Sequence, residues 1–327
     1  MANYIARRIL WIIPNLFAIS IVSFIIIQLP PGDWATSYIA ALRASGEQIS
    51  ESQVEDLRER YGLNDSLPTQ YFKWGSRVIQ GDFGRSFEWN LPVNEIMWGR
   101  LQLTLVVSLT TLVITWLLAF PIGIYSAVKQ YSIGDYIFTF IGFIGLAIPN
   151  FLLALIMLYI GLRYFNRSLT GLFSPEYVDA PWSFARFKDM LEHLWIPVLI
   201  LGTSGTAGLI RIMRANLLDE LRKPYVITAR AKGIPEWKVI LKYPVRVALN
   251  PFVSTVGWSL PRLVSGTIIV AIVLNLPTTG PLLLNALTSQ DMYLAASFIM
   301  ILSLLTVIGT LLSDILLAWL DPRIRYE

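Results

Sequence analysis

The sequence predicts an all-α integral membrane protein, with six transmembrane helices and an extracytoplasmic insertion after the first of them. Mean hydropathy is +0.58, and 55% of the residues are hydrophobic. Charged residues make up 15% of the chain, whereas a soluble domain carries about 25%. The long apolar runs lack the strict two-residue alternation of barrel strands, which favours helices as the spanning elements.

Six apolar runs reach or approach the ~20 residues that a helix needs to cross the hydrocarbon core. The first run follows Arg7 and Arg8 and is too long for a signal peptide, so we interpret it as an uncleaved anchor. The fourth run is short and rich in glycine, which suits close approach of helix backbones. The predicted spans are Ile9–Leu29, Leu103–Val128, Tyr136–Leu162, Leu194–Ile210, Leu249–Leu276 and Met292–Leu320.

The distribution of lysine and arginine predicts the orientation. Fourteen of the 26 basic residues lie in segments 1–8, 129–135, 211–248 and 321–327, which alternate spans place on one side. Segment 30–102 instead contains more acidic than basic residues. The positive-inside rule therefore places both termini in the cytoplasm.

This orientation gives the domain organisation. Residues 1–29 form the anchor helix, 30–102 the extracytoplasmic insertion, 103–320 a five-helix core with a cytoplasmic loop at 211–248, and 321–327 a cytoplasmic tail. Within the insertion, apolar spacing predicts helices over 50–61 and 70–78, and Gly81-Asp82-Phe83-Gly84 is typical of a turn. The second outside loop, Arg163–Glu192, contains two prolines and is predicted to be irregular.

Composition also excludes several kinds of chemistry. The chain has no cysteine and one histidine, His193, so thiolate sites and multi-histidine metal sites are excluded. No phosphate-binding Gly-x-x-x-x-Gly-Lys-Ser/Thr motif occurs, so any ATP that drives this protein is bound by another chain. The pI near 9.2 is explained by membrane topology and does not indicate a nucleic-acid partner. No nucleophile–base pair or paired carboxylate indicates catalysis, and the chain is not predicted to be an enzyme.

The segment between Pro224 and Pro244 is the most informative part of the chain. Pro224 suits the first position of a helix, and Gly233 suits the left-handed residue just after a helix end. Pro235 can then begin a second short helix that stops before Pro244. A structured basic loop between two spans favours docking to a soluble partner. The alternative is an ordinary cytoplasmic loop whose charge only sets topology.

At this point the sequence resembles the inner-membrane permeases of ATP-driven oligopeptide, dipeptide and nickel importers. The resemblance covers essentially the whole chain, and no single motif decides it. Its last and longest motif, Tyr225-Val-x-Thr228-Ala229-Arg230-Ala231-Lys232-Gly233, resembles the family's ATPase-binding loop. The earlier motifs are Arg7-Arg8-Ile9-Leu10, Ile13-Pro14, Pro31-Gly32-Asp33, Tyr61-Gly62-Leu63, Gln70-Tyr71, Gly81-Asp82-Phe83-Gly84-x-Ser86 and Pro92-Val93.

The resemblance implies the type I fold of importer permeases and a division of labour. A homologous second permease, usually a different chain, completes the pore. Two ATP-binding subunits or domains dock beneath it and carry ATP and magnesium, while an extracytoplasmic solute-binding protein delivers the cargo. This chain itself binds no cofactor. The resemblance assigns coupling to the ATPase, by contact or by backbone geometry, to Tyr225, Thr228, Ala229, Arg230, Ala231, Lys232, Gly233 and Pro235.

Three departures from the family pattern bear on the cargo. Thr278 replaces the first glycine of the family's Pro-Gly-x-Gly turn, and Trp34 stands where proline is common. An apolar residue near Ala271 replaces a glutamate in the preceding helix. A missing intramembrane acid changes how the pore treats a charged substrate, which argues against a simple dipeptide. Larger oligopeptides, oligosaccharides and nickel all stay open as cargo.

Two polar residues in the fifth predicted span are candidates for the pore lining. Arg262 lies near the middle of that span, where a charge is costly and normally faces protein or water. A structural ion pair with Asp314 of the sixth span is the equally weighted alternative. Asn275 is the second candidate, although asparagine in a membrane helix more often bonds a neighbouring helix.

Three other functions compete with the importer reading. A secondary transporter driven by protons or sodium normally carries intramembrane acids and internal repeats, and here such acids are nearly absent. A membrane enzyme needs a cluster of acids, histidines or a metal at one interface, and the sequence offers none. A scaffold subunit without a transport path is separated from the importer by a transport assay.

Overall fold

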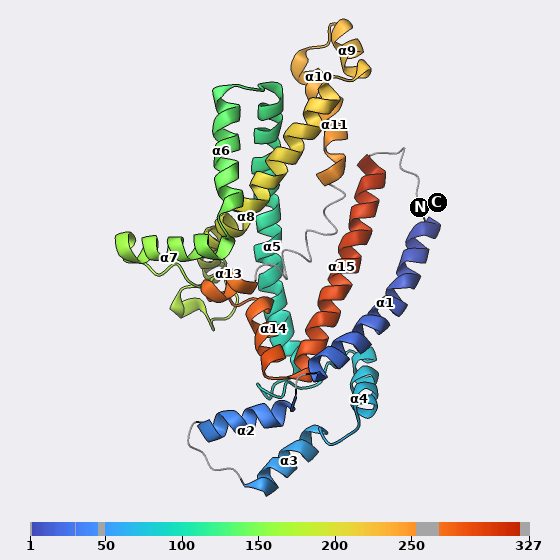
Figure 1. Ribbon diagram of the computed structural model, residues 1–327, viewed down its shortest axis with the longest axis vertical. Coiled ribbons are helices and arrows are strands. Elements are labelled where there is room, and N and C mark those ends of the chain that lie inside the picture. Colours follow the sequence, from blue (N-terminus) through green and yellow to red (C-terminus); the bar gives the residue numbers. More distant parts are fainter. Residues whose placement is uncertain (1, 30, 45–49, 253–267, 321–327) are drawn as a thin grey trace. The chain divides into compact units, whose positions relative to one another are not determined.

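The computed structural model describes residues 2–29, 31–44, 50–252 and 268–320 (Figure 1). Within these ranges every regular element is a helix, which confirms the all-α prediction. The chain divides into two compact units. We call Ile5–Thr104 with Thr278–Val307 the insertion unit, and Leu105–Pro277 with Met1–Tyr4 and Ile308–Glu327 the core unit.

The insertion unit combines the N-terminal helix with three short helices and parts of later ones. Short helices α2, α3 and α4 follow one another between α1 and α5 (Figure 1). Of these, α3 and α4 were predicted, whereas α2 was not. The bounds are α1 Ala2–Gln28, α2 Trp34–Ala44, α3 Glu51–Tyr61, α4 Leu67–Ile79, α5 Val93–Val128, α14 Thr279–Thr288 and α15 Met292–Leu320, with α5 and α15 continuing into the core unit.

Local sequence fixes the ends of the insertion helices. Ser50 caps α3 in a reciprocal capping box with Gln53, which satisfies backbone donors at the helix start. Gly62 ends α3 at φ 67°, a left-handed conformation that glycine adopts without a side-chain clash. The predicted turn at Gly81–Gly84 is also confirmed, because both glycines have positive φ.

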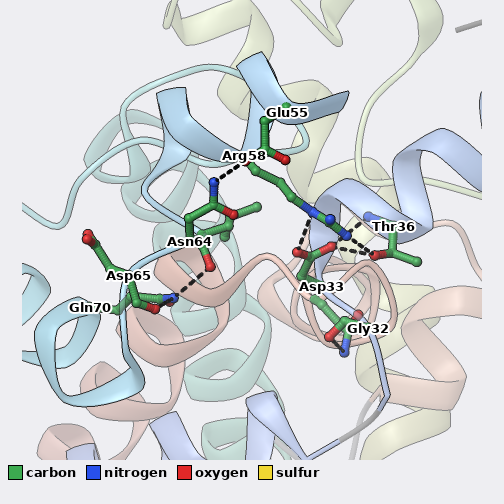
Figure 2. A network of polar contacts seen from close by, with 10 residues as sticks. Gly32, Asp33, Thr36, Glu55, Arg58, Asn64, Asp65 and Gln70 are labelled. Carbon is green, nitrogen blue, oxygen red and sulfur yellow. Dashed lines mark hydrogen bonds and ion pairs between the residues drawn. The ribbon is translucent and has the colours of Figure 1, made fainter. Parts of the chain in front are cut away.

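A polar network joins α2 to α3 (Figure 2). Thr36 donates to Asp33 Oδ1 from its backbone N–H at 2.7 Å and from its hydroxyl at 2.6 Å. Arg58 of α3 lies 3.2 Å from Asp33 Oδ2 and also donates to the Thr36 hydroxyl at 3.1 Å. Burial alone would raise the pKa of Asp33, but the bonds from Thr36 and the charge of Arg58 outweigh it and lower the pKa. The carboxylate therefore stays ionised and holds the two helices together.

An aromatic cluster forms the apolar counterpart of this network. The indole of Trp34 stacks on Tyr38 and meets the edge of Tyr61, with ring centroids 4.9 and 5.0 Å apart. Phe87 lies 5.1 Å from Tyr61 and 5.0 Å from Tyr293 of α15. Trp34 and Phe87 are each 3% exposed, so these rings form a core for the insertion unit. Trp34 is therefore a packing residue.

A buried carboxylate, Asp291, ties the loop before α5 to the start of α15. Its Oδ2 accepts from the Ser86 hydroxyl at 2.5 Å and from the Glu88 backbone N–H at 3.2 Å. Its Oδ1 accepts from the Leu294 backbone N–H at 3.2 Å. Burial raises the pKa of Asp291 despite these hydrogen bonds. The sequence analysis did not single out this residue.

The core unit is built around two long helices, α5 and α8, with shorter helices attached. The predicted fourth span is part of α8, which begins ten residues earlier and ends eleven residues later than expected. The elements are α6 Ile133–Ala147, α7 Asn150–Phe165, the 3₁₀ turn Pro175–Tyr177, α8 Phe184–Leu221, α9 Pro224–Ala231, α10 Glu236–Lys242, α11 Pro244–Ala248 and α13 Ile268–Val273.

Part of the loop predicted to be irregular is therefore helical, since Phe184–Glu192 belongs to α8. The rest is held in place by side chains from that helix. Arg186 lies between the rings of Phe173 and Trp182, 4.8 Å from each centroid. Asp189 accepts from both the backbone N–H and the hydroxyl of Ser174, at 2.8 and 2.6 Å.

Four described helices are long and apolar enough to span a bilayer: Leu10–Gln28, α5, α8 and Met292–Leu317. The third predicted span is divided into α6 and α7, which meet at a 98° bend. The break falls at Ile148-Pro149, where proline disfavours a helical preceding residue. Counted as one span, this pair brings the described spans to five. Most of the fifth predicted span, Leu249–Leu276, lies outside the described residues.

We predict that Asp291→Asn loosens the loop that precedes α5. Each Asp291 oxygen faces a backbone N–H that cannot reverse, so an amide must present its NH₂ to Glu88 or Leu294. Such an unsatisfied buried donor costs about 1–3 kcal/mol. The variant should unfold at lower temperature in detergent and be cleaved faster between residues 81 and 92.

Asp82→Asn is the matched control. Asp82 uses one described oxygen, Oδ1, to accept from the Gly84 backbone N–H, and asparagine retains such an oxygen. Equal melting temperatures for wild type and Asp291→Asn would contradict the structural role of Asp291.

Candidate functional site

The segment between α8 and residue 248 folds as three consecutive short helices, α9, α10 and α11 (Figure 1). Prolines set their starts: Pro224 opens α9, Pro235 is the N-cap of α10, and Pro244 opens α11. The two helices that local chemistry predicted are present at the predicted places. We call Pro224–Ala248 the helical segment.

The turn between α9 and α10 depends on Gly233. Its φ is +72°, in the left-handed region that residues with a Cβ atom disfavour. A Cβ built at this position would have no neighbouring atom within 4 Å. The requirement for glycine is therefore a matter of backbone conformation and does not come from crowding.

A small apolar core holds α9 against α10. Val226 and Val239 are fully buried, and Ala229 is 5% exposed between them. Ile234 and Tyr243 pack around these three. Of the two roles predicted for Ala229, contact or geometry, the structure favours geometry, because its side chain faces the segment's own core.

An ion pair fastens the same two helices at the surface. Arg230 Nη2 lies 2.7 Å from Glu236 Oε1, and Arg230 Nε donates to both carboxylate oxygens at 3.1 Å. The guanidinium lowers the pKa of Glu236, and the carboxylate raises the pKa of Arg230. The charge of Arg230, a residue assigned to coupling by the resemblance, is paired within the segment. Lys232 follows α9 as its C-cap and is exposed.

Several large apolar side chains are exposed on the helical segment. Ile227 is 57% exposed and Trp237 is 62% exposed, and both were absent from the predicted site. Tyr225, which was predicted, is 40% exposed, and its hydroxyl donates to Glu220 at 2.5 Å. Burial of the hydroxyl and the Glu220 carboxylate raise the pKa of Tyr225. The remaining predicted residues are also on the surface: Thr228, whose hydroxyl bonds Pro224 O at 2.9 Å, Ala231, and Pro235.

A second apolar core attaches the helical segment to the long helices. Met213 and Leu217 of α8 are fully buried in it, together with Ala127 at the end of α5. Residues of α10 and α11 complete the cluster, including Ile240 and Val245. The segment is thus packed onto α5 and α8 and is not a free loop.

An ion pair that sequence inspection missed joins α6 to α8 in the same unit. Arg214 donates to Asp135 through Nε to Oδ1 at 2.9 Å and through Nη2 to Oδ2 at 2.8 Å. The Asp135 side chain is 3% exposed and that of Arg214 is 26% exposed. A signal existed, because a lone acid at the edge of an apolar run normally has a basic partner. The partner lies 79 residues away, and local spacing does not identify it.

Of the two candidate pore residues, the structure describes Asn275 but not Arg262. Arg262, and with it the alternative pair with Asp314, lies outside the described residues. Asn275 is exposed just after α13 and adopts a left-handed φ of 49°. It therefore ends a helix rather than lying within one. Thr278 is the N-cap residue of α14, a short helix that was predicted only as a turn.

The described residues offer no metal centre. Among them, no group of three or more histidine, aspartate or glutamate side chains could hold an ion. A groove of about 540 Å³ between α5, α6 and α8 is lined by aliphatic, aromatic, glycine and threonine residues. Its described lining contains no charged side chain, so the groove offers no acid–base chemistry.

Comparison with known families identifies the class of protein. Residues 119–326 match the model of the binding-protein-dependent transport system inner membrane component. Residues 1–110 match the N-terminal model of the same membrane components. The chain belongs to this family, which confirms the resemblance drawn from its motifs: it is a multi-pass membrane permease of the ATP-driven importer class with the type I permease fold.

Individual relatives are similar over their whole length. The oligopeptide transport system permease protein AppB of Bacillus subtilis is 37% identical over 330 residues, covering all of both chains. The dipeptide transport system permease protein DppB of Alkalihalophilus pseudofirmus is 32% identical over 340 residues, again with full coverage. The glutathione transport system permease protein GsiC of Escherichia coli K12 is 31% identical over 327 residues, also with full coverage.

We predict that Gly233→Val distorts the turn between α9 and α10, whereas Gly233→Asn preserves it. Valine is strained at φ +72°, but asparagine tolerates the left-handed region. The strain should cost about 1–3 kcal/mol locally. Limited proteolysis between residues 231 and 236 should be faster in the valine variant than in the asparagine variant.

Equal protection of the two variants would contradict the requirement for a residue that tolerates positive φ at position 233. Gly208→Ala provides a further control, since its Cβ would also lie in open space and the residue is in a regular helix.

Proposed function

We propose that the chain is one half of the pore of an ATP-driven importer of peptides and that its helical segment receives the force of ATP hydrolysis. The observation that carries the proposal is that the segment combines a packed interior with exposed apolar side chains. It is stiffened from inside by the Val226–Val239 core and the Arg230–Glu236 pair, yet presents Ile227 and Trp237 outward. Exposed apolar side chains on a rigid base are typical of a docking surface.

The partner of this surface is proposed to be an ATP-binding subunit. ATP favours the closed ATPase dimer, and helices docked to the two ATPase subunits move with it as rigid bodies. That movement exposes the pore to one side of the membrane at a time. ATP and magnesium belong to the partner, in keeping with the absence of a phosphate-binding motif from this chain.

Assembly and orientation follow from the same proposal. A homologous second permease completes the pore, and an extracytoplasmic solute-binding protein delivers the cargo. The helical segment and both termini face the cytoplasm, since lysine and arginine are concentrated in those segments. Residues 30–102 face outward, because acidic residues outnumber basic ones in that segment.

Peptides are proposed as the cargo because the relatives named above are permeases for oligopeptides, dipeptides and glutathione. Nothing in the described residues favours nickel, since no metal-binding group occurs among them. An apolar residue near Ala271 stands where the family pattern has a glutamate. A pore without that charge is proposed to admit longer peptides as well as short ones.

Purification of the complex from native membranes in mild detergent tests the assembly. Mass spectrometry should find a second permease and one or two ATP-binding proteins in stoichiometric amounts. In vesicles, the complex with its binding protein should accumulate labelled peptides when ATP is present on the side of the helical segment. Recovery of the chain without an ATPase in several detergents would contradict the proposal.

Ile227→Glu tests the docking surface directly. Ile227 is exposed, so the variant should fold and insert normally. A charge at the centre of an apolar interface typically costs about 2 kcal/mol or more, so recovery of the ATPase should fall by an order of magnitude. Val178→Glu, at a residue of similar exposure outside the segment, is the matched control and should retain the ATPase. Full ATPase recovery with Ile227→Glu would place docking elsewhere.

A further inference from the structure

We propose that the Asp135–Arg214 ion pair fixes α6 to α8, so that a displacement received by α9 is passed to α6 as a movement of one rigid body. This inference rests on the proposed function, in which α9 docks to the ATPase. It assigns a positioning role to two residues that lie outside the helical segment and outside the family's ATPase-binding motif.

The first support is that both oxygens of the Asp135 carboxylate accept hydrogen bonds. Oδ1 accepts from Arg214 Nε at 2.9 Å, and Oδ2 accepts from Arg214 Nη2 at 2.8 Å and from the Tyr131 backbone N–H at 2.9 Å. Two parallel N–H···O bonds fix both distance and orientation. Arg214 is therefore held to the first turn of α6 and to the turn that connects α6 with α5.

The second support is the position of Arg214 along α8. That helix runs without a break to Leu221, and α9 begins at Pro224. Arg214 is ten residues before Pro224, about 15 Å along a helix at 1.5 Å per residue. Met213 and Leu217, on either side of Arg214, are fully buried in the core that holds α10 and α11. A displacement of the helical segment therefore reaches Arg214 through packed side chains and continuous helix.

The third support comes from two close contacts between α6 and α8 that are made at glycines. A Cβ at Gly145 would lie 2.8 Å from Thr203 Cγ2, and one at Gly142 would lie 3.7 Å from Ala207 Cβ. Glycine at these two positions allows the helices to approach closely, but it supplies no side chain that could bond the partner helix. The buried, bidentate ion pair supplies the directional contact that these small residues do not.

A cross-link tests whether α6 and α8 move together. The chain has no cysteine, so Gly142→Cys with Ala207→Cys introduces one defined pair. The 3.7 Å Cβ separation falls within the 3.5–4.5 Å range of disulfides. In the reconstituted complex, the oxidised pair should transport peptide at the rate of the reduced pair. Loss of transport on oxidation, reversed by reduction, would show that α6 slides on α8 and would overturn the proposal.

Arg214→Lys tests the ion pair itself, because lysine keeps the charge and loses the bidentate geometry. The variant should recover the ATPase normally and hydrolyse ATP. Peptide transported per ATP should fall about five-fold or more, the lower range of measured coupling between sites. The 142–207 disulfide should restore the ratio in this variant, a result that a purely structural role of the pair does not give. An unchanged ratio, or a lowered ratio that the disulfide fails to restore, would overturn the proposal.

Two further variants keep the test decisive. If Arg214→Lys fails to assemble, the double variant Asp135→Leu with Arg214→Met replaces it, because removing both charges leaves neither unpaired. If this double variant also fails to assemble, the ion pair serves folding alone and the proposal is overturned. Lys188→Met disrupts an exposed pair with Glu192 on the same helix and should retain the wild-type ratio. Absence of ATP-driven uptake by the wild-type complex would count against the proposed function and not against the ion pair.

Discussion

Hydrocarbon offers no hydrogen-bond partners, and this constraint shapes the whole chain. Every backbone N–H and C=O in the bilayer must be satisfied within a helix, so movement across the membrane is carried by whole helices and by the side chains between them. The 38-residue helix α8 is the clearest case, since it continues past its predicted end to the start of α9. A helix break inside α8 would separate the helical segment from the membrane. The observed break, at Pro149, instead lies between α6 and α7.

Two buried carboxylates, Asp291 and Asp135, are hydrogen-bonded in a similar way. Asp291 in the insertion unit and Asp135 in the core unit are each nearly inaccessible, and each accepts three described hydrogen bonds. Both stand at the first turn of a helix or just before it, where backbone donors are free. Their partners differ: Asp291 bonds neutral donors and orders a loop, whereas Asp135 bonds a guanidinium from a second helix. A buried ion pair adds little net stability, but it fixes position.

The parts that sequence predicted are those governed by local chemistry. Gly233, Pro224 and Pro235 defined the two helices of the segment, because conformation at such residues depends little on distant contacts. Apolar runs located the first, second and sixth spans and part of the fourth, because hydropathy is also a local property. Prediction from sequence failed where contacts with distant residues determine the structure. Helix α2 depends on Trp34 packing against Tyr61 and Phe87. The extension of α8 to Phe184 depends on Asp189 and Arg186, which bind the preceding loop. The partner of Asp135 lies in the same category.

The candidate site shows why motif and geometry have to be combined. The motif drew attention to Ala229 and Arg230, yet the first is buried and the second is paired with Glu236. Both stabilise the segment, and the exposed surface is formed by Ile227 and Trp237, whose residue types gave no local signal. A surface that transmits force has to be stiff, because a compliant base would absorb the displacement that it receives. In the proposed docking, Ala229 and Arg230 are therefore part of the stiff base, and the exposed Ile227 and Trp237 form the contact.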